Sequence, residues 1–282
     1  MRLVPRGFAF LFCLPAGILF TLFFLLPLGS VVAESFGDSG RAYYRFFIDP
    51  VFWRGLQGTM ILGTAAPLLS VLVGLFVALH LARKTSARRM ALLFLISLPL
   101  TFSGLIVAYG FILVFGRAGF VTLLAAQLGA NPATLAGFVF SPWGLGMAYS
   151  YYLIPRAVLI LLPAILNFRF DEIAAARSLG ASAFRAHVDI MIPQIMPSLF
   201  AAFCLTSAVA IGAYGTALAL VGTQVNILPL LLYSKISESG SDFPAAAAMS
   251  VILMAICCLV VTAAEVLVRR MRANGDATGR GA

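Results

Sequence analysis

The chain has 282 residues, of which 62% are hydrophobic and only 10% charged, and its formal net charge is +9. Soluble domains contain about 45–50% apolar and about 25% charged residues, so this composition excludes a soluble enzyme, a disordered chain and a collagen-like fibre. The apolar residues come in long blocks, which predicts a polytopic α-helical membrane protein. The positive charges lie in short clusters between these blocks, a pattern typical of residues that orient membrane spans. No nucleic-acid partner is therefore expected.

Six apolar blocks reach the length of about 20 residues that a transmembrane helix needs. The predicted spans are residues 8–32, 59–81, 91–116, 143–166, 198–221 and 245–268. The first block is longer than the apolar segment of about 7–15 residues in a signal peptide, so it is expected to be retained. The sequence therefore predicts an all-α membrane protein with six transmembrane helices, surrounded by lipid, in a single transmembrane domain over residues 1–282.

The basic residues are divided unevenly between the two sides of these spans. One side carries thirteen Lys and Arg residues and the other carries five, while Arg156 falls inside the fourth span. The side richer in Lys and Arg faces the cytoplasm in membrane proteins. Both termini and the connections near residues 82–90 and 167–197 are therefore expected in the cytoplasm.

The connection 167–197 is the main polar interruption of the chain, and its pattern predicts two short helices joined at a glycine. Asp171 and Glu172 suit a helix N-terminus, where the helix dipole favours negative charge. Gly180 suits the left-handed position just after a helix. Ser182 can cap the next helix through its hydroxyl. A cytoplasmic helix-turn-helix loop is thus expected between the fourth and fifth spans.

The first of these short helices carries an apolar face. Ala175, Ala176 and Leu179 are spaced so that they share one side of the helix, which suits docking into a groove of a soluble partner. Pro193 and Pro197 are expected to end the second short helix before the fifth span begins.

This loop resembles the EAA loop of binding-protein-dependent ABC transporter permeases. The motif reads E-A-A, three residues, G, nine residues, I, any residue, L-P. Ala175 and Ala176 match the two alanines, Gly180 matches the glycine, and Ile190 and Pro193 match the later positions, with Ile192 in place of leucine. The glutamate position holds Ala174; Glu172 lies two residues earlier, roughly 200° around a helix, and does not simply replace it. The residues assigned to the coupling loop by this resemblance are Glu172, Ala175, Ala176, Leu179, Gly180, Ala181, Ser182, Ile190 and Pro193.

Other segments share the resemblance, which covers nearly the whole chain. They are Pro155 in the fourth span, the run Gly212-Ala213-Tyr214-Gly215 and the run Asp242-Phe243-Pro244-Ala245. The resemblance implies an importer permease in a bacterial cytoplasmic membrane, and the sequence looks most similar to the polyamine, iron and phosphonate branches of the family. It also implies an ATPase dimer docked on the loop, a second identical or paralogous permease protomer, and a periplasmic solute-binding protein.

The sequence contains no motif for nucleotide binding, catalysis or metal binding by this chain itself. It has no G-x-x-x-x-G-K-[ST] phosphate-binding motif, and its only lysines are Lys84 and Lys235. ATP and Mg²⁺ are therefore expected on the partner ATPase, with no cofactor on this chain. No catalytic residue is predicted, and the two histidines and four cysteines have no spacing that suggests a metal site.

Arg156 is the most unusual residue within a predicted span. A charged side chain near the bilayer centre costs about 2.5–3.5 kcal/mol on insertion scales, so it should face a cavity or a partner. Two interpretations stay open: a pathway residue that meets an anionic solute, or a structural arginine that pairs with backbone carbonyls. The candidate pathway residues are Tyr152, Pro155, Arg156, Gly212, Tyr214 and Thr216.

Two other functions compete with the importer. An ion-driven secondary transporter would need coupling residues near mid-membrane on broken helices, and Arg156 beside Pro155 is the only feature in its favour. A non-transporting membrane scaffold would explain six spans but gives no reason for the spacing within the loop.

Overall fold

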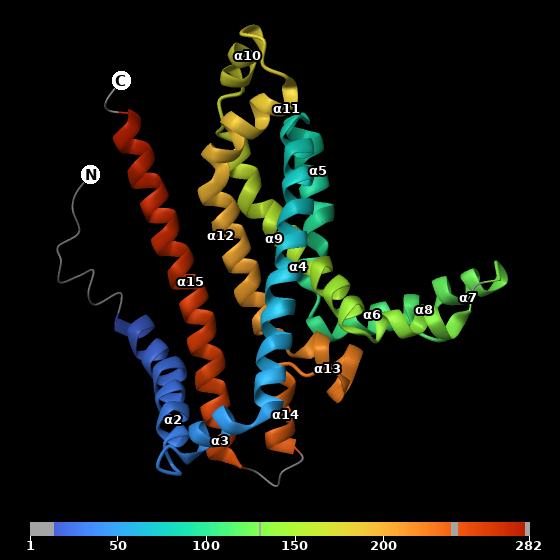
Figure 1. Ribbon diagram of the computed structural model, residues 1–282, viewed down its shortest axis with the longest axis vertical. Helices are drawn as coiled ribbons and strands as arrows, with labels where there is room; N and C mark the ends of the chain where they lie inside the picture. The colour runs from blue at the N-terminus through green and yellow to red at the C-terminus, as the bar shows by residue number, and fades with distance from the viewer. Residues whose placement is uncertain (1–13, 130, 238–241, 280–282) are drawn as a thin grey trace.

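The computed structural model describes residues 14–129, 131–237 and 242–279 (Figure 1). Every regular element in these residues is helical, and six stretches are long and apolar enough to cross a membrane. They are Leu14–Ser35, Pro50–Ala82, Gly104–Gln127, Pro142–Leu166, Ala183–Ile211 and Phe243–Arg270. The prediction of an all-α membrane protein with six candidate spans is confirmed. The start of the first predicted span lies outside the described residues.

The helices follow one another with short connections. They are α2 (Leu26–Ser35), α3 (Arg41–Ile48), α4 (Pro50–Ala82), α5 (Ser86–Ser97), α6 (Gly104–Phe115), α7 (Phe120–Gln127), α8 (Pro132–Val139), α9 (Pro142–Leu166), α10 (Phe170–Ser178), α11 (Ala183–Ala186), α12 (Ile192–Ile211), α13 (Gly215–Val221), α14 (Leu228–Ser237) and α15 (Phe243–Gly279). Four short irregular helices accompany them: η1 (Thr21–Leu25), η2 (Leu98–Thr101), η3 (His187–Met191) and η4 (Gly222–Gln224).

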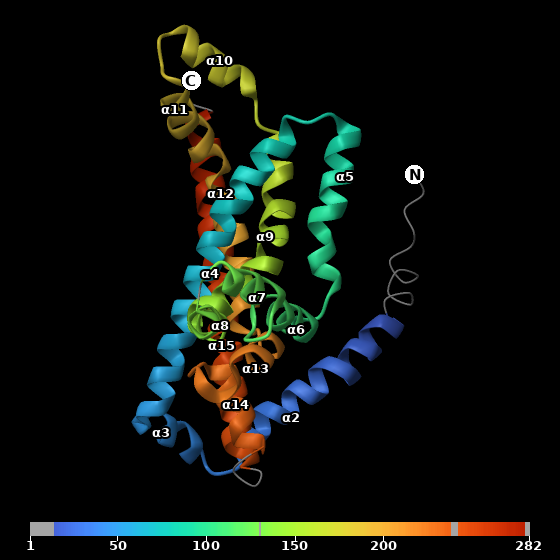
Figure 2. The same cartoon turned by 90° about the vertical axis from the view of Figure 1, so that its right-hand side faces the viewer.

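The centre of the molecule is formed by α4, α9 and α12, which pack against one another (Figures 1 and 2). The approach of α4 to α9 is close at Gly74, where an added Cβ would lie 2.8 Å from Ala157 Cβ. Small residues allow helices to approach in this way in membranes. On the outer side, α15 packs against α12, and α2 packs against α15.

The third predicted span, 91–116, is wrong as a single helix. The structure divides it into α5 and α6, separated by η2 and by extended backbone at Phe102 and Ser103. Pro99 has no N–H to continue the helical ladder of α5. The Ser103 hydroxyl then accepts from the Ile106 N–H and caps a new helix. Hydropathy did not reveal the break, because the segment is apolar on both sides of it.

The fifth predicted span, 198–221, is also divided. Helix α12 ends at Ile211, the chain bends over residues 212–214, and α13 begins at Gly215. The bend leaves backbone carbonyls without helical donors, and the Tyr149 hydroxyl donates to Ala213 O at 2.8 Å. A polar side chain of α9 therefore stabilises the break in α12–α13.

The prediction that Pro193 and Pro197 end the second short helix is wrong. A continuous helical stretch runs over Ala183–Ile211, with Pro193 in the first turn of α12 and Pro197 inside it. The turn before Pro193 is the π-helical η3, in which Ile192 N–H donates to His187 O. A proline ring clashes with the carbonyl four residues earlier in a regular α-helix. A wider π-turn absorbs such an irregularity without ending the helix.

The connections that follow the first, third and fifth predicted spans also contain helices. Helices α7 and α8 form an arm that extends from the end of α6, as Figure 1 shows in green at the right. Helix α14 packs against α4 and α15. Its first N–H, at Leu228, donates to the buried Thr59 Oγ1 at 2.8 Å, so α14 is fixed to the core rather than loose.

Candidate functional site

The segment between α9 and α12 is a helical hairpin built around Gly180. Gly180 has φ +93°, a conformation that L side chains rarely adopt. The Gly180 N–H donates to Arg177 O, and the Ala181 N–H donates to Ala176 O at 3.1 Å. This is the bonding pattern of a glycine C-cap. Ser182 Oγ then accepts from Arg185 N at 3.2 Å and caps α11.

The hairpin is anchored to the spans on its inner side. Ile173 of α10, Ala186 of α11 and Met191 of η3 are buried in one cluster with residues of α9 and α4. Across the hairpin, Gln194 Nε2 donates to Glu172 Oε2 at 2.6 Å. The first turn of α10 is thereby tied to the first turn of α12.

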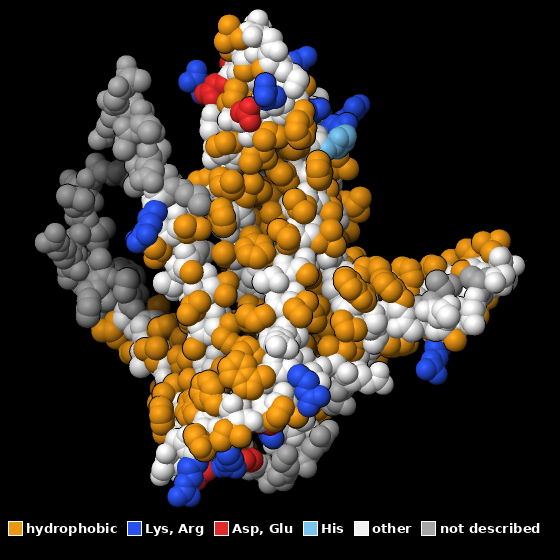
Figure 3. Space-filling model, viewed as in Figure 1, with side chains coloured by type: hydrophobic (Ala, Val, Ile, Leu, Met, Phe, Trp, Pro, Cys, Tyr) orange, Lys and Arg blue, Asp and Glu red, His pale blue; other side chains and the backbone are white. Residues whose placement is uncertain are grey.

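The outer side of the hairpin presents two exposed apolar side chains, which we call the apolar tip. Leu179 is 90% exposed and Phe184 is 81% exposed. Arg177 and Arg185, close to them in the sequence, are exposed as well, and Figure 3 shows charged side chains gathered at the top of the molecule. A large apolar residue at each end of a tight turn suits insertion into a groove of another protein. Sequence reasoning found Leu179 but missed Phe184, whose exposure depends on the turn at Gly180.

The other loop residues singled out from the sequence have different environments. Ala175 is exposed, whereas Ala176 is half-buried against the anchoring cluster, so the predicted shared apolar face is divided. Ala181 and Ile190 pack against the same cluster, and Pro193 is exposed. Ala174, at the motif's glutamate position, is exposed as well.

Replacing Gly180 with valine is expected to loosen the hairpin. A Cβ at Gly180 would meet nothing within 4 Å, so the cost comes from the left-handed backbone alone, about 1–2 kcal/mol. Trypsin should then cut after Arg177 or Arg185 about tenfold faster than in the wild type. Asn tolerates this conformation better, so G180N should be cut at a rate between the two. Equal cutting of wild type and G180V would contradict the strained turn.

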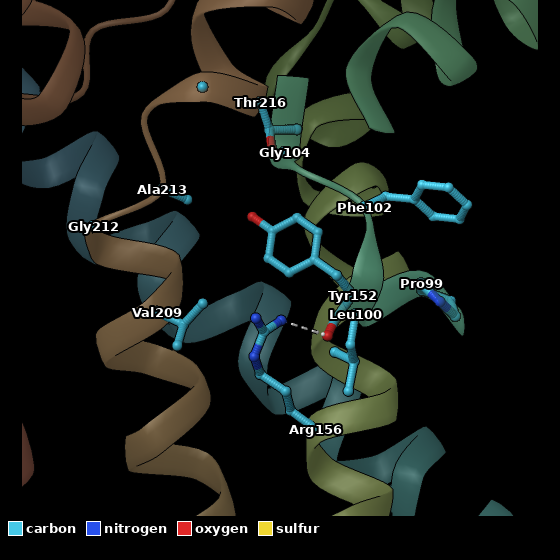
Figure 4. A pocket seen from close by; sticks show the side chains of 11 residues that line it. Pro99, Leu100, Phe102, Gly104, Tyr152, Arg156, Val209, Gly212, Ala213 and Thr216 are labelled. Carbon is cyan, nitrogen blue, oxygen red and sulfur yellow. Dashed lines mark hydrogen bonds between the residues drawn. The ribbon is translucent and has the colours of Figure 1, made fainter. Parts of the chain in front are cut away.

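A second feature is a pocket of about 280 Å³ next to both helix breaks (Figure 4). It lies between η2 and the start of α6 on one side, α9 on another, and the α12–α13 bend on the third. The residues that line it are Pro99, Leu100, Phe102, Gly104, Tyr152, Arg156, Val209, Gly212, Ala213, Gly215 and Thr216. Four of the six candidate pathway residues, Tyr152, Arg156, Gly212 and Thr216, therefore meet in one place.

Arg156 and Tyr152 project from the same face of α9 into this pocket (Figure 4). Arg156 Nη1 donates to Tyr152 O at 2.9 Å, and Arg156 Cζ lies 5.5 Å from the centre of the Tyr152 ring. Pro155 lacks an N–H and crowds the carbonyl four residues earlier, that of Tyr151, whereas the guanidinium binds the next carbonyl, that of Tyr152. The negative face of the Tyr152 ring attracts the Arg156 guanidinium.

The remaining two candidates lie outside the pocket lining. Pro155 is buried within α9, which continues through it. The Tyr214 ring packs against Tyr233, with 5.5 Å between the ring centres. Sequence reasoning missed Gly104, which the break at η2 brings to the pocket; Pro99 inside the apolar block was the available signal.

The protein-family model for the binding-protein-dependent transport system inner membrane component matches residues 70–273, a range that includes the hairpin and the pocket. The chain belongs to this family. As a member it is the permease component of a binding-protein-dependent ABC importer, a transport subunit rather than an enzyme. This membership decides between the importer and the two competing functions considered from the sequence.

Curated relatives of this permease are distant in sequence. Sulfate permease 2 of the Chlamydomonas reinhardtii chloroplast is 26% identical over 82% of this chain and 62% of that protein. The thiamine transport system permease ThiP of Escherichia coli is 27% identical over 75% of this chain and 39% of that protein. This permease thus spans less than two thirds of the length of both. The sulfate permease CysW of Synechocystis is 25% identical over 95% of this chain and 96% of that protein.

A solved structure has the same fold. One chain of a bacterial alginate ABC transporter, in complex with a periplasmic protein that holds an alginate pentasaccharide, superposes with a TM-score of 0.76. The match covers 94% of this permease and 95% of that chain, at 18% identity. At this identity the likeness concerns the fold alone.

Proposed function

We propose that this permease forms part of the solute pathway of an ATP-driven importer in a bacterial cytoplasmic membrane, and that an ATPase dimer docks on the α10–α11 hairpin. The observation that carries the proposal is the hairpin itself, anchored at Ile173 and Glu172 yet exposing its apolar tip. ATP and Mg²⁺ bind the ATPase, because this chain has no phosphate-binding motif.

The mechanism is alternating access driven through the hairpin. Closure of the ATPase dimer on ATP displaces the apolar tip, and the tie between Glu172 and Gln194 transmits that displacement to α12. Helices α9 and α12 also carry the pocket walls at Arg156 and Gly212. A rigid-body shift of these helices therefore changes access to the pocket from one side of the membrane to the other.

The partners follow from the same arrangement. A second permease protomer, identical or paralogous, completes the pathway, and a periplasmic solute-binding protein delivers the solute. The family description names binding-protein dependence, and the alginate transporter was solved in complex with its periplasmic protein.

The solute is a small polar molecule. The relatives' names include sulfate, an anion, and thiamine, a cation, so they do not define the charge of this solute. They also give no particular support to the polyamine, iron or phosphonate branches expected from the sequence. The pocket is the better guide to the solute's charge.

Co-purification from native membranes tests the proposed function. The tagged permease, extracted in mild detergent, should retain an ATPase subunit that mass spectrometry identifies by its peptides. ATP hydrolysis by the purified complex should rise when the periplasmic binding protein and its solute are added. A permease that retains no ATPase under these conditions would refute the docking proposal.

The orientation of the molecule can be measured separately. We expect the hairpin in the cytoplasm and the end of α14 in the periplasm, because the hairpin side carries most of the Lys and Arg residues. In a background without the native cysteines, a membrane-impermeant maleimide should label S237C in intact cells. It should label S178C only after the cytoplasmic membrane is opened. The reverse labelling pattern would invert the assignment.

A further inference from the structure

We infer that the pocket between η2, α9 and the α12–α13 bend binds the anionic group of the transported solute, with the Arg156 guanidinium and the Tyr152 hydroxyl as its ligands. The inference rests on the proposed function, because it places a solute site on the pathway of an importer.

Arg156 has no counter-charge among the described residues. Arg156 is the fifteenth of the 25 residues of α9, so it lies near the middle of a candidate span, where an uncompensated charge is costly. Among the described residues no carboxylate lies within 4.0 Å of its guanidinium; the five ion pairs join other residues. Its recorded partners are Tyr152 O and the Tyr152 ring, which leave most of its N–H donors open. The missing partner is an anion.

The Tyr152 hydroxyl is a second donor at the pocket. Tyr152 is only 8% exposed, and its hydroxyl makes no hydrogen bond of regular geometry among the described residues, with the Thr216 side chain close by. Buried polar groups are nearly always paired in native proteins, so an orphan indicates a missing partner. The side chain lies in the pocket beside the Arg156 guanidinium (Figure 4). A ligand that satisfies both groups at once needs an oxygen that accepts from each.

The start of α6 also lines the pocket, at Gly104. The first N–H groups of a helix have no partners within it, and the helix dipole places partial positive charge there; at α6 the Ser103 hydroxyl accepts from one of them, the Ile106 N–H. A Cβ on Gly104 would lie 2.4 Å from Thr216 Oγ1, so glycine is needed for α13 to approach α6 this closely. The approach closes the pocket on the side opposite Arg156.

These groups select the ligand's class. A guanidinium, a hydroxyl and a helix N-terminus favour an oxyanion such as a sulfate, phosphonate or carboxylate group. They disfavour polyamines, ferric iron and thiamine, because a cation would meet the Arg156 charge. A volume of about 280 Å³ has room for such a group with several waters, since each water takes about 30 Å³ in the liquid.

The test titrates the purified permease in lipid nanodiscs with inorganic sulfate, against sodium chloride at matched ionic strength, and follows thermal unfolding. A bound ligand raises the midpoint in proportion to its affinity. The apparent Kd for sulfate should rise about a hundredfold in R156Q and about tenfold in Y152F, while R156K retains part of the binding. R54Q, which removes an exposed arginine of α4, is the matched control and should titrate as the wild type does.

Sulfate also stabilises proteins by exclusion from their surfaces, and that effect is equal in every variant. Wild type and R156Q that titrate alike would overturn the inference, as would Arg156-dependent stabilisation by spermidine in place of sulfate. If R156Q fails to fold, Y152F and R156K give the same comparison. ATPase co-purification on these variants separates the two proposals. If the ATPase is retained but sulfate binding does not depend on Arg156, only the anion site in the pocket is refuted. If the wild type retains no ATPase, the proposed function is refuted.

Discussion

The double variant L179E/F184E is expected to lose its ATPase partner while the permease remains folded in the membrane. Both side chains are exposed in the isolated chain, so charge there costs the fold little. In the docked complex the same positions would bury two unpaired carboxylates in an apolar groove, which is costly. We expect ATPase co-purification to fall at least about a hundredfold, since apolar anchors carry most of the energy of such interfaces.

The control for this loss is L128E. Leu128, at the end of α7, is 85% exposed but lies on the arm, away from the hairpin (Figure 1). It should leave co-purification unchanged. If L128E and L179E/F184E lose the ATPase equally, the loss reflects general damage rather than docking. If neither loses it, the apolar tip is not the docking site.

The second large effect is expected at Gly58, where α4 meets the segment leading into α14. A Cβ on Gly58 would lie 2.2 Å from the backbone oxygen of Asn226, which cannot move as the end of a flexible side chain can. Valine should therefore displace α14 and break the bond from Leu228 N to Thr59 Oγ1. Such overpacking costs about 1–3 kcal/mol, so the unfolding midpoint of the purified permease should fall by several degrees.

The matched control for G58V is G110V. A Cβ on Gly110 of α6 would meet nothing within 4 Å, so the two variants add the same side chain to a helix with and without a close neighbour. G110V should unfold close to the wild-type midpoint. A midpoint for G58V equal to that of G110V would show that α14 is not seated on α4 as described.

The number of candidate spans was predictable, because apolar length is a property of composition. The breaks at residues 98–103 and 212–214 were not, since both lie inside apolar blocks where hydropathy stays high. They depend on contacts distant in sequence, such as the bond from the Tyr149 hydroxyl to Ala213 O. Tertiary contacts of this kind determine where a membrane helix can be interrupted.

The hairpin and the pocket were predictable to different degrees. The turn at Gly180 and the cap at Ser182 are local features, which residue type and spacing indicate. Arg156 was recognisable from its cost in a span. Its setting was not, because Gly104 and Thr216 reach the pocket only through the two helix breaks.

Site-specific photocrosslinking in native membranes shows whether the apolar tip touches an ATPase. A photoreactive phenylalanine analogue in place of Phe184 should yield, on illumination, a crosslinked product that contains an ATPase subunit. The same analogue in place of Leu128 should yield none. Crosslinking at 184 that captures no ATPase, or equal capture at 184 and 128, would contradict docking at the apolar tip.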